Sequence, residues 1–512
     1  MTARELEAAV DRADRFSMQW AATPLDERLA MLSRARGVLL RRAEELARLI
    51  AMEQGKPLAE ALASEIMVAL GHLSYLTAEM PRMMNDAPRR PWSPFLSDRM
   101  ARVVVSPRGL TSVISAWNMP FVVPFCQLAS CVAVGNPAIL RPSTATPLIA
   151  LAIGEIFAES GVPPAALGVA VCRSEEAQPL VADPRVRLLL FTGSTAVGRE
   201  LAAKGARQLC RVVLELGGKD PMIVFDDAPL ERAARGAVWS AFFNAGQACS
   251  STERVYVQRG IFSRFTARVV ELTRELVTGD PLDPETDIGP MTTEEGVVKV
   301  ESQIRDALAK GARLLTGGGR VGGSGRLFAP TVLADVTSDM AVMSEETFGP
   351  LLPIMAFDAE DEAVALANAS EYGLTASVWT RDPARARRVE GDLHAGTVTC
   401  NDANFTFSEA TAPWGGVKAT GLGRTHGPEG LAELVDVKYI SEDWSDRDRN
   451  FWWYPYNRKQ VAFLHTSMRA LHAATLAARG AAFVGLTPWL PALARSASLT
   501  ALMGRLPDML GQ

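Results

Sequence analysis

The fold is decided by residues 186–225, VRLLLFTGSTAVGRELAAKGARQLCRVVLELGGKDPMIVF, in which apolar runs alternate with a more polar stretch. The run VRLLLFT has the length and apolar content of a buried strand. GSTAVG provides a turn into a helix, and CRVVLELGGKDPMIVF returns to strand-like sequence. A strand, a helix and another strand in this order predict a parallel sheet with helices packed on its faces.

The same alternation continues on both sides of this stretch. Residues up to about 80 place apolar side chains at helical spacing, and residues 101–172 alternate between strand and helix patterns. A second alternating region runs from about 230 to 420, and it begins with an expected helix over LERAARGAVWSAFFNAGQ (230–247). We therefore expect two α/β regions, each with a sheet covered by helices.

The composition is that of an ordinary soluble protein, with 512 residues, 48% hydrophobic residues and a net charge of -5. These values exclude a collagen, a coiled coil and wholesale disorder. Because 58 Asp and Glu outnumber 53 Lys and Arg, we expect no nucleic-acid partner. The N-terminal sequence lacks the apolar core of a signal peptide and the six cysteines form no CxxC pair, so we expect a reducing cytoplasm.

Metal-binding patterns are absent from the sequence. The five histidines are dispersed, without HExxH or a Cys/His spacing, so we expect no metal; they are His72, His394, His426, His465 and His472.

One uncharged stretch, residues 109–140, is long enough to cross a bilayer. Its three prolines, two asparagines, glutamine and glycine would leave polar groups unsatisfied in lipid. We interpret it as a buried strand, an active-site turn and a buried helix.

The chemistry is concentrated in two motifs. Cys249, in FFNAGQACSSTERVYV, lies between an expected helix and an expected strand, where a lone cysteine is usually only a small buried side chain. Glu215 lies near the end of a strand and before a Gly-Gly turn, which is where ligands and catalytic groups collect in open α/β sheets. A carboxylate in that position can serve as a base.

Two further turns fit a ligand site. Gly193, Ser194 and Gly198 lie between a strand and a helix, where backbone N–H groups can face a pyrophosphate, although such turns often bind nothing. Asn118, in ISAWNMPF, is either a turn residue or a donor to an oxyanion.

These four features resemble the aldehyde dehydrogenase superfamily when they are taken with EETFGPLLPI at 345–354 and PWGGVKATGLGR at 413–424. The resemblance covers roughly residues 20–440. It implies that Cys249 is the nucleophile, Glu215 the general base and Asn118 the side-chain half of the oxyanion hole. The positions that it assigns to the cofactor are Trp117, Arg141, Ser143, Thr144, Arg173, Gly193, Ser194, Gly198, Leu216, Glu346 and Phe348.

The reaction implied by the resemblance is oxidation of an aldehyde to its carboxylic acid with NAD(P)+, through a thiohemiacetal and a thioester of Cys249. Two alternatives remain open. A coenzyme-A-acylating dehydrogenase is disfavoured by Glu215, which such relatives typically lack. A non-catalytic, membrane-tethered aldehyde-binding scaffold is disfavoured because all three reacting positions are intact.

Two departures from the family pattern bear on function. The usual KPSE is replaced by Arg141-Pro142-Ser143-Thr144, which removes an acid that would repel a 2′-phosphate. With Arg173 this favours NADP+ slightly, while plain NAD+ use stays open. Gln127 and Thr425 replace a lysine and a glutamate of many relatives, which indicates a different proton route.

The resemblance also implies the architecture: an α/β fold with a doubly wound Rossmann-like cofactor domain, a second α/β catalytic domain and a small oligomerisation strand arm in a homodimer or homotetramer. The expected boundaries are 1–88 and 108–217 for the NAD(P) domain, 218–416 for the catalytic domain, 89–107 and 432–443 for the arm, and 444–512 for a C-terminal extension.

The substrate and the extension are the least determined features. Apolar side chains near the nucleophile favour an apolar aldehyde, aliphatic or aromatic; they are Trp239, Phe242, Phe243, Phe405, Phe407 and Trp414. The extension is loosely similar to the tails of the fatty-aldehyde branch, which implies peripheral membrane contact. Its uncharged run at 480–494 is too short to span a bilayer, and packing against a partner subunit is the preferred interpretation.

Overall fold

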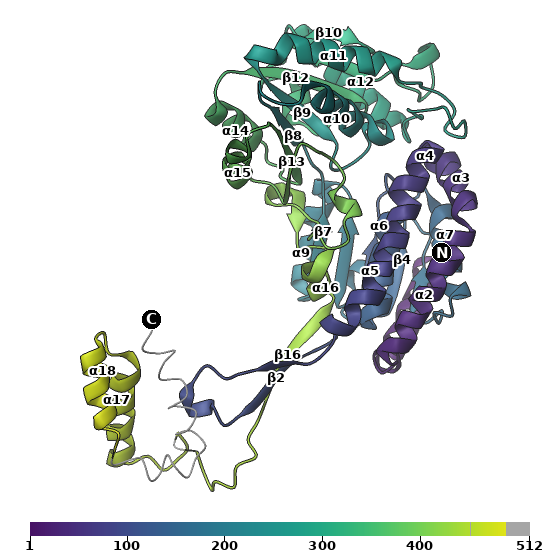
Figure 1. Cartoon of the computed structure of the whole chain (residues 1–512). Helices are drawn as coiled ribbons and strands as arrows, with labels where there is room; N and C mark the ends of the chain where they lie inside the picture. The colour runs from purple at the N-terminus through teal and green to yellow at the C-terminus, as the bar shows by residue number, and fades with distance from the viewer. Residues whose placement is uncertain (451, 488–512) are drawn as a thin grey trace. The chain divides into compact units, whose positions relative to one another are not determined.

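The computed structural model describes residues 1–450 and 452–487 (Figure 1). The chain forms two compact units. The first unit contains residues 1–83 and 107–436, and the second contains residues 84–106 and the described residues after 436.

A six-stranded sheet in the first unit confirms the doubly wound arrangement. Its order is β15-β7-β6-β3-β4-β5, and all neighbours are parallel except β15 and β7. Its strands are β3 (Thr111–Ile114), β4 (Ala138–Arg141), β5 (Leu167–Val169), β6 (Leu188–Thr192), β7 (Arg211–Glu215) and β15 (Gly421–Leu422). The strand order reverses between β3 and β6, and ligands of open α/β sheets bind at such a switch point.

Helices cover this sheet. α6 (Val122–Val134) packs on β3 and β4, α7 (Pro147–Glu159) packs on β5, and α9 (Thr195–Arg207) packs on β6 and β7. All residues of α6 are buried, which explains why the sequence around it carries no charge and confirms its interpretation as a core element. The N-terminal region is helical as predicted, with α1 (Ala3–Ala21), α2 (Leu25–Arg41) and α3 (Ala43–Gln54).

Residues 58–83 form the one helical run of the described chain that is long and apolar enough to cross a membrane. The run consists of α4 (Leu58–Glu60), η1 (Ala61–Ile66) and α5 (Met67–Met83). It is 44% buried inside the protein, and α5 packs against α2 and α6. Buried core helices of soluble proteins have the same length and composition, so this run is weak evidence for a membrane span.

A seven-stranded sheet confirms the second α/β region. Its order is β10-β11-β12-β9-β8-β13-β14, and only β10 is antiparallel to its neighbour. Its strands are β8 (Asp220–Val224), β9 (Thr252–Gln258), β10 (Arg313–Thr316), β11 (Thr331–Ala334), β12 (Leu351–Phe357), β13 (Thr375–Trp379) and β14 (Thr397–Cys400).

Two hydrophobic cores lie on the two faces of this sheet. α10 (Leu230–Phe242) and α11 (Phe262–Glu275) contribute to one core. The other core contains residues of α12 (Glu294–Ala309), α14 (Glu360–Asn368) and α15 (Pro383–Asp392). Helices on both faces explain why the central strands are apolar on both sides.

The helix expected over 230–247 is shorter than predicted. α10 ends at Phe242, and a short 3-10 segment, η4 (Phe243–Gly246), follows it. Asn244 and Ala245 have φ angles of 54° and 53°, which no α-helix contains. The chain therefore turns sharply just before Cys249.

The second unit contains a three-stranded sheet of order β1-β2-β16, with β1 (Ala87–Arg89), β2 (Met100–Pro107) and β16 (Val435–Glu442). α17 (Arg458–His472) and α18 (Leu476–Val484) pack side by side after it (Figure 1). The uncharged run predicted at 480–494 begins at the end of α18, and its residues 488–494 lie outside the described chain.

Candidate active site

Cys249 lies half-buried in the loop between η4 and β9. Asn244, Ala245 and Gly246 precede it with three consecutive left-handed φ angles, of 54°, 53° and 72°. Such a conformation is costly for non-glycine residues and persists only where the surroundings fix it. A Cβ atom at Gly246 would lie 2.1 Å from the carbonyl oxygen of Gly349, so only glycine permits this approach of two loops.

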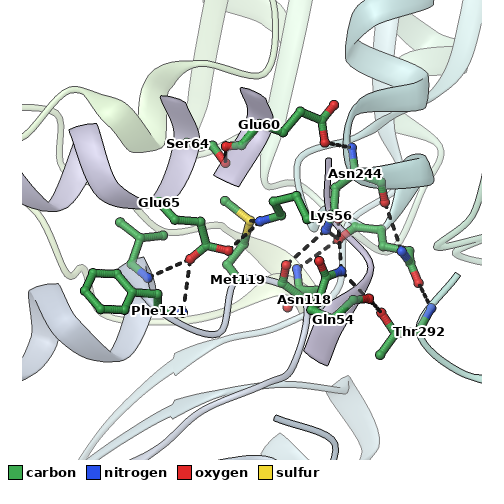
Figure 2. Close-up of polar contacts among 12 residues, drawn as sticks. Gln54, Lys56, Glu60, Ser64, Glu65, Asn118, Met119, Phe121, Asn244 and Thr292 are labelled. Carbon is green, nitrogen blue, oxygen red and sulfur yellow. Dashed lines mark hydrogen bonds and ion pairs between the residues drawn. The ribbon is translucent and has the colours of Figure 1, made fainter. Parts of the chain in front are cut away.

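A network of buried amides holds the loop before Cys249 in place (Figure 2). The Asn244 amide donates to the backbone carbonyls of Asn118 at 3.0 Å and Gln247 at 3.1 Å. Gln54 at the end of α3 donates to the Asn244 Oδ1 at 2.9 Å, and Gln247 accepts from the Thr292 N–H at 2.8 Å. The loop that precedes Cys249 and the turn of Asn118 are therefore joined by one network of hydrogen bonds, which gives the site a fixed geometry.

Asn118 follows β3, and its amide Nδ2 donates to the carbonyl of Gln247 at 3.1 Å. The turn that carries it is fixed by Glu65, whose carboxylate accepts the N–H groups of Phe121 at 3.0 Å and Val122 at 2.8 Å (Figure 2). Lys56 forms an ion pair with Glu65, and both side chains are fully buried. Removing Lys56 would leave the charge of Glu65 buried and uncompensated. Lys56 therefore keeps the Glu65 carboxylate in the position from which it holds the Asn118 turn.

Glu215 is the last residue of β7, as the sequence predicted. Its Oε2 accepts a hydrogen bond from Thr192 at 3.1 Å, and its Oε1 accepts one from Thr425. Burial raises the pKa of Glu215 to about 7, although both hydroxyl bonds oppose that rise. A carboxyl group with this pKa can take up and release a proton near neutral pH.

The turn after β7 touches the backbone of Cys249. A Cβ atom at Gly218 would lie 2.2 Å from the carbonyl oxygen of Cys249, so this contact requires glycine. The Gly-Gly turn thus allows the strand end that carries Glu215 to approach the backbone of Cys249.

A cavity of about 440 Å³ contains Cys249, Asn118 and Glu215. Most of the side chains around it are apolar, and its aromatic residues are Trp239, Phe243, Phe405, Phe407 and Trp414. Phe242, the sixth aromatic residue singled out in the sequence, belongs to the core of the second sheet and borders a neighbouring cavity.

Glu60 is a lining residue that the sequence did not indicate. Its carboxylate accepts the backbone N–H of Asn244 at 2.9 Å (Figure 2). Burial raises its pKa to about 8, with the nearby Lys56 opposing the rise. No sequence motif marks Glu60, because its place in the cavity lining depends on how the helical run 58–83 packs.

A second cavity of about 300 Å³ adjoins the reacting residues at the switch point between β3 and β6. It shares Asn118, Glu215 and Cys249 with the first. Six of the predicted cofactor residues line it: Trp117, Gly193, Ser194, Leu216, Glu346 and Phe348. Glu295 and Lys299 of α12 also line it, and no feature of the sequence had pointed to them.

The loop of Glu346 and Phe348 is held by buried charges. Glu253 accepts the N–H groups of Thr347 at 2.6 Å and Phe348 at 2.9 Å, and it pairs with Lys219 at 2.6 Å. Phe348 has a φ angle of 56°, a strained value that this anchoring maintains. Glu346 accepts the N–H of Gly218 at 3.1 Å, and burial raises the pKa of its carboxyl to about 7.

The other predicted cofactor residues lie outside this cavity. Gly198 in the first turn of α9 packs so closely that a Cβ atom would lie 2.4 Å from the Leu216 side chain. Ser143 and Thr144 follow β4, and the Thr144 side chain is exposed.

Arg141 and Arg173 are brought close to each other by neighbouring strands β4 and β5. The Arg141 Nη2 donates to the carbonyl of Cys172 at 3.4 Å and to the Ser174 hydroxyl at 3.1 Å, on either side of Arg173. Its Nε is buried without a hydrogen-bond partner in the described chain.

Comparisons with known proteins identify the family of this chain. Residues 1–440 match the model of the aldehyde dehydrogenase family. A 3-sulfolactaldehyde dehydrogenase of Pseudomonas putida is 40% identical, over 87% of this chain and 91% of that protein. An NADP+-dependent succinate-semialdehyde dehydrogenase of Escherichia coli is 39% identical, over 86% of this chain and 90% of that protein. A betaine aldehyde dehydrogenase of Cereibacter sphaeroides is also 39% identical, over 85% of this chain and 88% of that protein.

Solved structures give the same result. An NADP-dependent enzyme of E. coli has a TM-score of 0.83 at 38% identity, covering 86% of this chain and 91% of that one. An indole-3-acetaldehyde dehydrogenase in complex with NAD+ has a TM-score of 0.82 at 31% identity, covering 86% of this chain and 89% of that one. These matches show an oxidoreductase that uses NAD or NADP. The chain belongs to the aldehyde dehydrogenase family.

Proposed function

We propose that this enzyme oxidises a neutral, mainly apolar aldehyde, aliphatic or aromatic, to its carboxylic acid with NAD(P)+. The observation that carries the proposal is the cavity that contains Cys249, Asn118 and Glu215 and adjoins a second cavity at the switch point of the sheet. The aldehyde would occupy the first cavity and the nicotinamide the second.

The reaction begins with the Cys249 thiolate, which attacks the aldehyde carbon and forms a thiohemiacetal. Burial raises the pKa of the Cys249 thiol above its ordinary value, so the thiol must first release its proton to solvent. The amide of Asn118 and the backbone N–H of Cys249 stabilise the oxyanion.

A nicotinamide bound in the second cavity would accept the hydride that leaves the former aldehyde carbon. The resulting Cys249 thioester is hydrolysed by a water molecule whose proton passes to Glu215. The carbon–sulfur bond breaks, the free acid leaves, and the proton on Glu215 passes to the sulfur, which restores the thiol and the carboxylate. Retention of Glu215 disfavours transfer of the acyl group to coenzyme A.

The charge of the aldehyde cavity restricts its substrates. None of the described residues that line it is Lys or Arg, and Glu60 adds a carboxyl group. An anionic aldehyde would lose its hydration there without gaining a cationic partner from the described lining residues.

We expect hexanal, decanal and benzaldehyde to be oxidised with a kcat/KM at least about tenfold above that of succinic semialdehyde. The measurement is reduced-nicotinamide formation with NAD+ and NADP+ separately, with Cys249→Ser as the blank. Preference for succinic semialdehyde would contradict the substrate proposal, and no turnover above the blank with any aldehyde would contradict the proposed function.

We further propose that NADP+ is preferred to NAD+. Support comes from Arg141, whose buried Nε lacks a partner in the described chain, and from Thr144, which replaces the acid of many relatives. An arginine fork suits a 2′-phosphate. Arg141→Gln should raise KM for NADP+ about tenfold or more and change KM for NAD+ less than about twofold. Equal effects on both would contradict the assignment.

We also propose an assembly and a cellular location. The β1-β2-β16 arm would join subunits into a homodimer or homotetramer in the cytoplasm. Residues 449–507 contain seven Lys or Arg and no acid, and Trp444, Trp453 and Tyr454 are 77%, 51% and 78% exposed. These features suit an anionic lipid surface. Co-sedimentation with anionic and neutral vesicles, compared with a chain ending at residue 443, tests this contact.

A further inference from the structure

Three potential metal ligands meet behind the active site. They are His72 on α5, Cys126 on α6 and His426 at the start of α16 (Gly427–Glu433). One ligand atom from each residue lies within 4.8 Å of the other two, and all three residues are buried. Neither the proposed reaction nor the cofactor cavity uses any of them.

Both imidazoles have an unsatisfied nitrogen. The Nδ1 atoms of His72 and His426 are buried and form no hydrogen bond in the described chain. A buried polar atom without a partner has lost its hydration without compensation, so two in one place call for an explanation. The two rings lie 5.1 Å apart, centroid to centroid.

The second nitrogen of His72 already has the kind of contact that orients a metal ligand. Its Nε2 lies 3.0 Å from the Ser130 hydroxyl, on the same helix as Cys126. If Nε2 carries the proton and donates to Ser130, Nδ1 keeps the lone pair. Metal-binding histidines are commonly fixed in this way by a hydrogen bond from the other nitrogen.

We propose that His72, Cys126 and His426 bind a zinc-type divalent cation. Two imidazoles and one thiolate form the ligand set that borderline-soft ions prefer, and a water molecule would complete a tetrahedron. Metal–ligand bonds of about 2.0–2.3 Å place neighbouring ligands roughly 3.5 Å apart, so the three side chains would close in by about 1 Å. On binding, the Cys126 S–H bond breaks, a sulfur–metal bond forms and the proton goes to solvent.

The test is a cobalt titration of the full chain after treatment with a chelator. All samples carry Cys249→Ser, so that the proposed nucleophile cannot bind the ion. We expect one Co2+ per chain, a thiolate-to-cobalt absorption band in the near ultraviolet, and displacement of the band by Zn2+. This readout does not depend on aldehyde turnover.

Four variants locate the site. Cys126→Ser and His426→Gln should each abolish the band and weaken cobalt binding at least about 100-fold, and Ser130→Ala should weaken it about 10- to 100-fold. Cys131→Ser is the matched control, because Cys131 is also buried on α6, and it should retain the band. Circular dichroism checks that each variant is folded.

Absence of stoichiometric binding in the parent, or a band that survives in His426→Gln, would overturn the proposal. Cobalt bound at the described tail histidines, His465 and His472, would give no thiolate band and would also overturn it.

Discussion

Cys249→Ser is expected to lower aldehyde oxidation by at least about 10⁴-fold in kcat, because the hydroxyl is a far weaker nucleophile than the thiolate and forms no thioester. The cavity and the hydrogen bonds of Asn118 and Glu215 do not depend on the sulfur, so binding of the aldehyde should change little. The measurement is the initial rate of reduced-nicotinamide formation under saturating aldehyde and cofactor.

Cys400→Ser is the control for this experiment, because Cys400 is an exposed thiol on β14 outside both cavities. It should retain the parent rate within about twofold. Residual turnover by Cys249→Ser within tenfold of the parent would exclude Cys249 as the nucleophile.

The sequence predicted the parts of the site that lie at strand ends. Asn118 follows β3 and Glu215 ends β7, and the turn of Gly193 and Ser194 follows β6. The carboxyl ends of parallel strands face the same edge of a sheet, so a strand pattern followed by a polar residue predicts a place in the site. Cys249 was predicted with them because its motif stands between two recognisable elements.

The supporting residues could not be predicted in this way. Lys56 and Glu65 pair beneath the Asn118 turn, and Glu253 pairs with Lys219 beneath Phe348. Each charge is buried only because distant segments pack around it, and local hydropathy carries no sign of that packing. The same limit applies to Glu60, whose helical run reads as an ordinary amphipathic segment.

Dispersal along the chain does not exclude a metal site that is formed by tertiary contacts. His72 and His426 are separated by most of the sequence, yet their rings lie 5.1 Å apart in the fold. Spacing rules find metal sites that are built on one hairpin or helix, and they miss sites that form where separate helices meet. The expectation of no metal rested on spacing alone.

The helix break at Asn244 was also beyond the sequence. Its residues favour a helix through position 247, but tertiary contacts override that preference. The Asn244 side chain is fixed by Gln54 and by two backbone carbonyls, and Gly246 meets the Gly349 carbonyl. These contacts stabilise a turn that the local sequence does not favour.

Glu215→Gln is expected to lower steady-state turnover about 10²- to 10³-fold while leaving a burst of close to one reduced nicotinamide per active site. Hydride transfer precedes hydrolysis in the proposed sequence, so the acyl enzyme forms and then accumulates. Rapid mixing with NADP+ and a good aldehyde measures both phases. A variant that turns over at the parent rate, or that gives neither burst nor turnover, would contradict the role of Glu215 in deacylation.

The same carboxyl group should control the dependence of both rate and stability on pH. Turnover in the parent should rise with pH through an apparent pKa of about 7, because only the carboxylate accepts a proton from water, and Glu215→Gln should show no such rise. Burial favours the neutral acid, which raises its pKa from 4.5 in the unfolded chain to about 7 in the folded protein.

The folded protein therefore holds this proton more tightly, and the contribution of Glu215 to stability falls as the pH rises from 4.5 to 7. Above pH 7 the buried carboxylate costs roughly 3 kcal/mol relative to the neutral acid. The Glu215→Gln variant lacks this cost. Its gain in free energy of unfolding over the parent should therefore be larger at pH 8 than at pH 5. Urea unfolding at the two pH values measures the difference. If the variant and the parent differ in free energy of unfolding by the same amount at pH 5 and pH 8, Glu215 has the same pKa in the folded and the unfolded chain. A base with that ordinary pKa could not produce the rise in rate near pH 7.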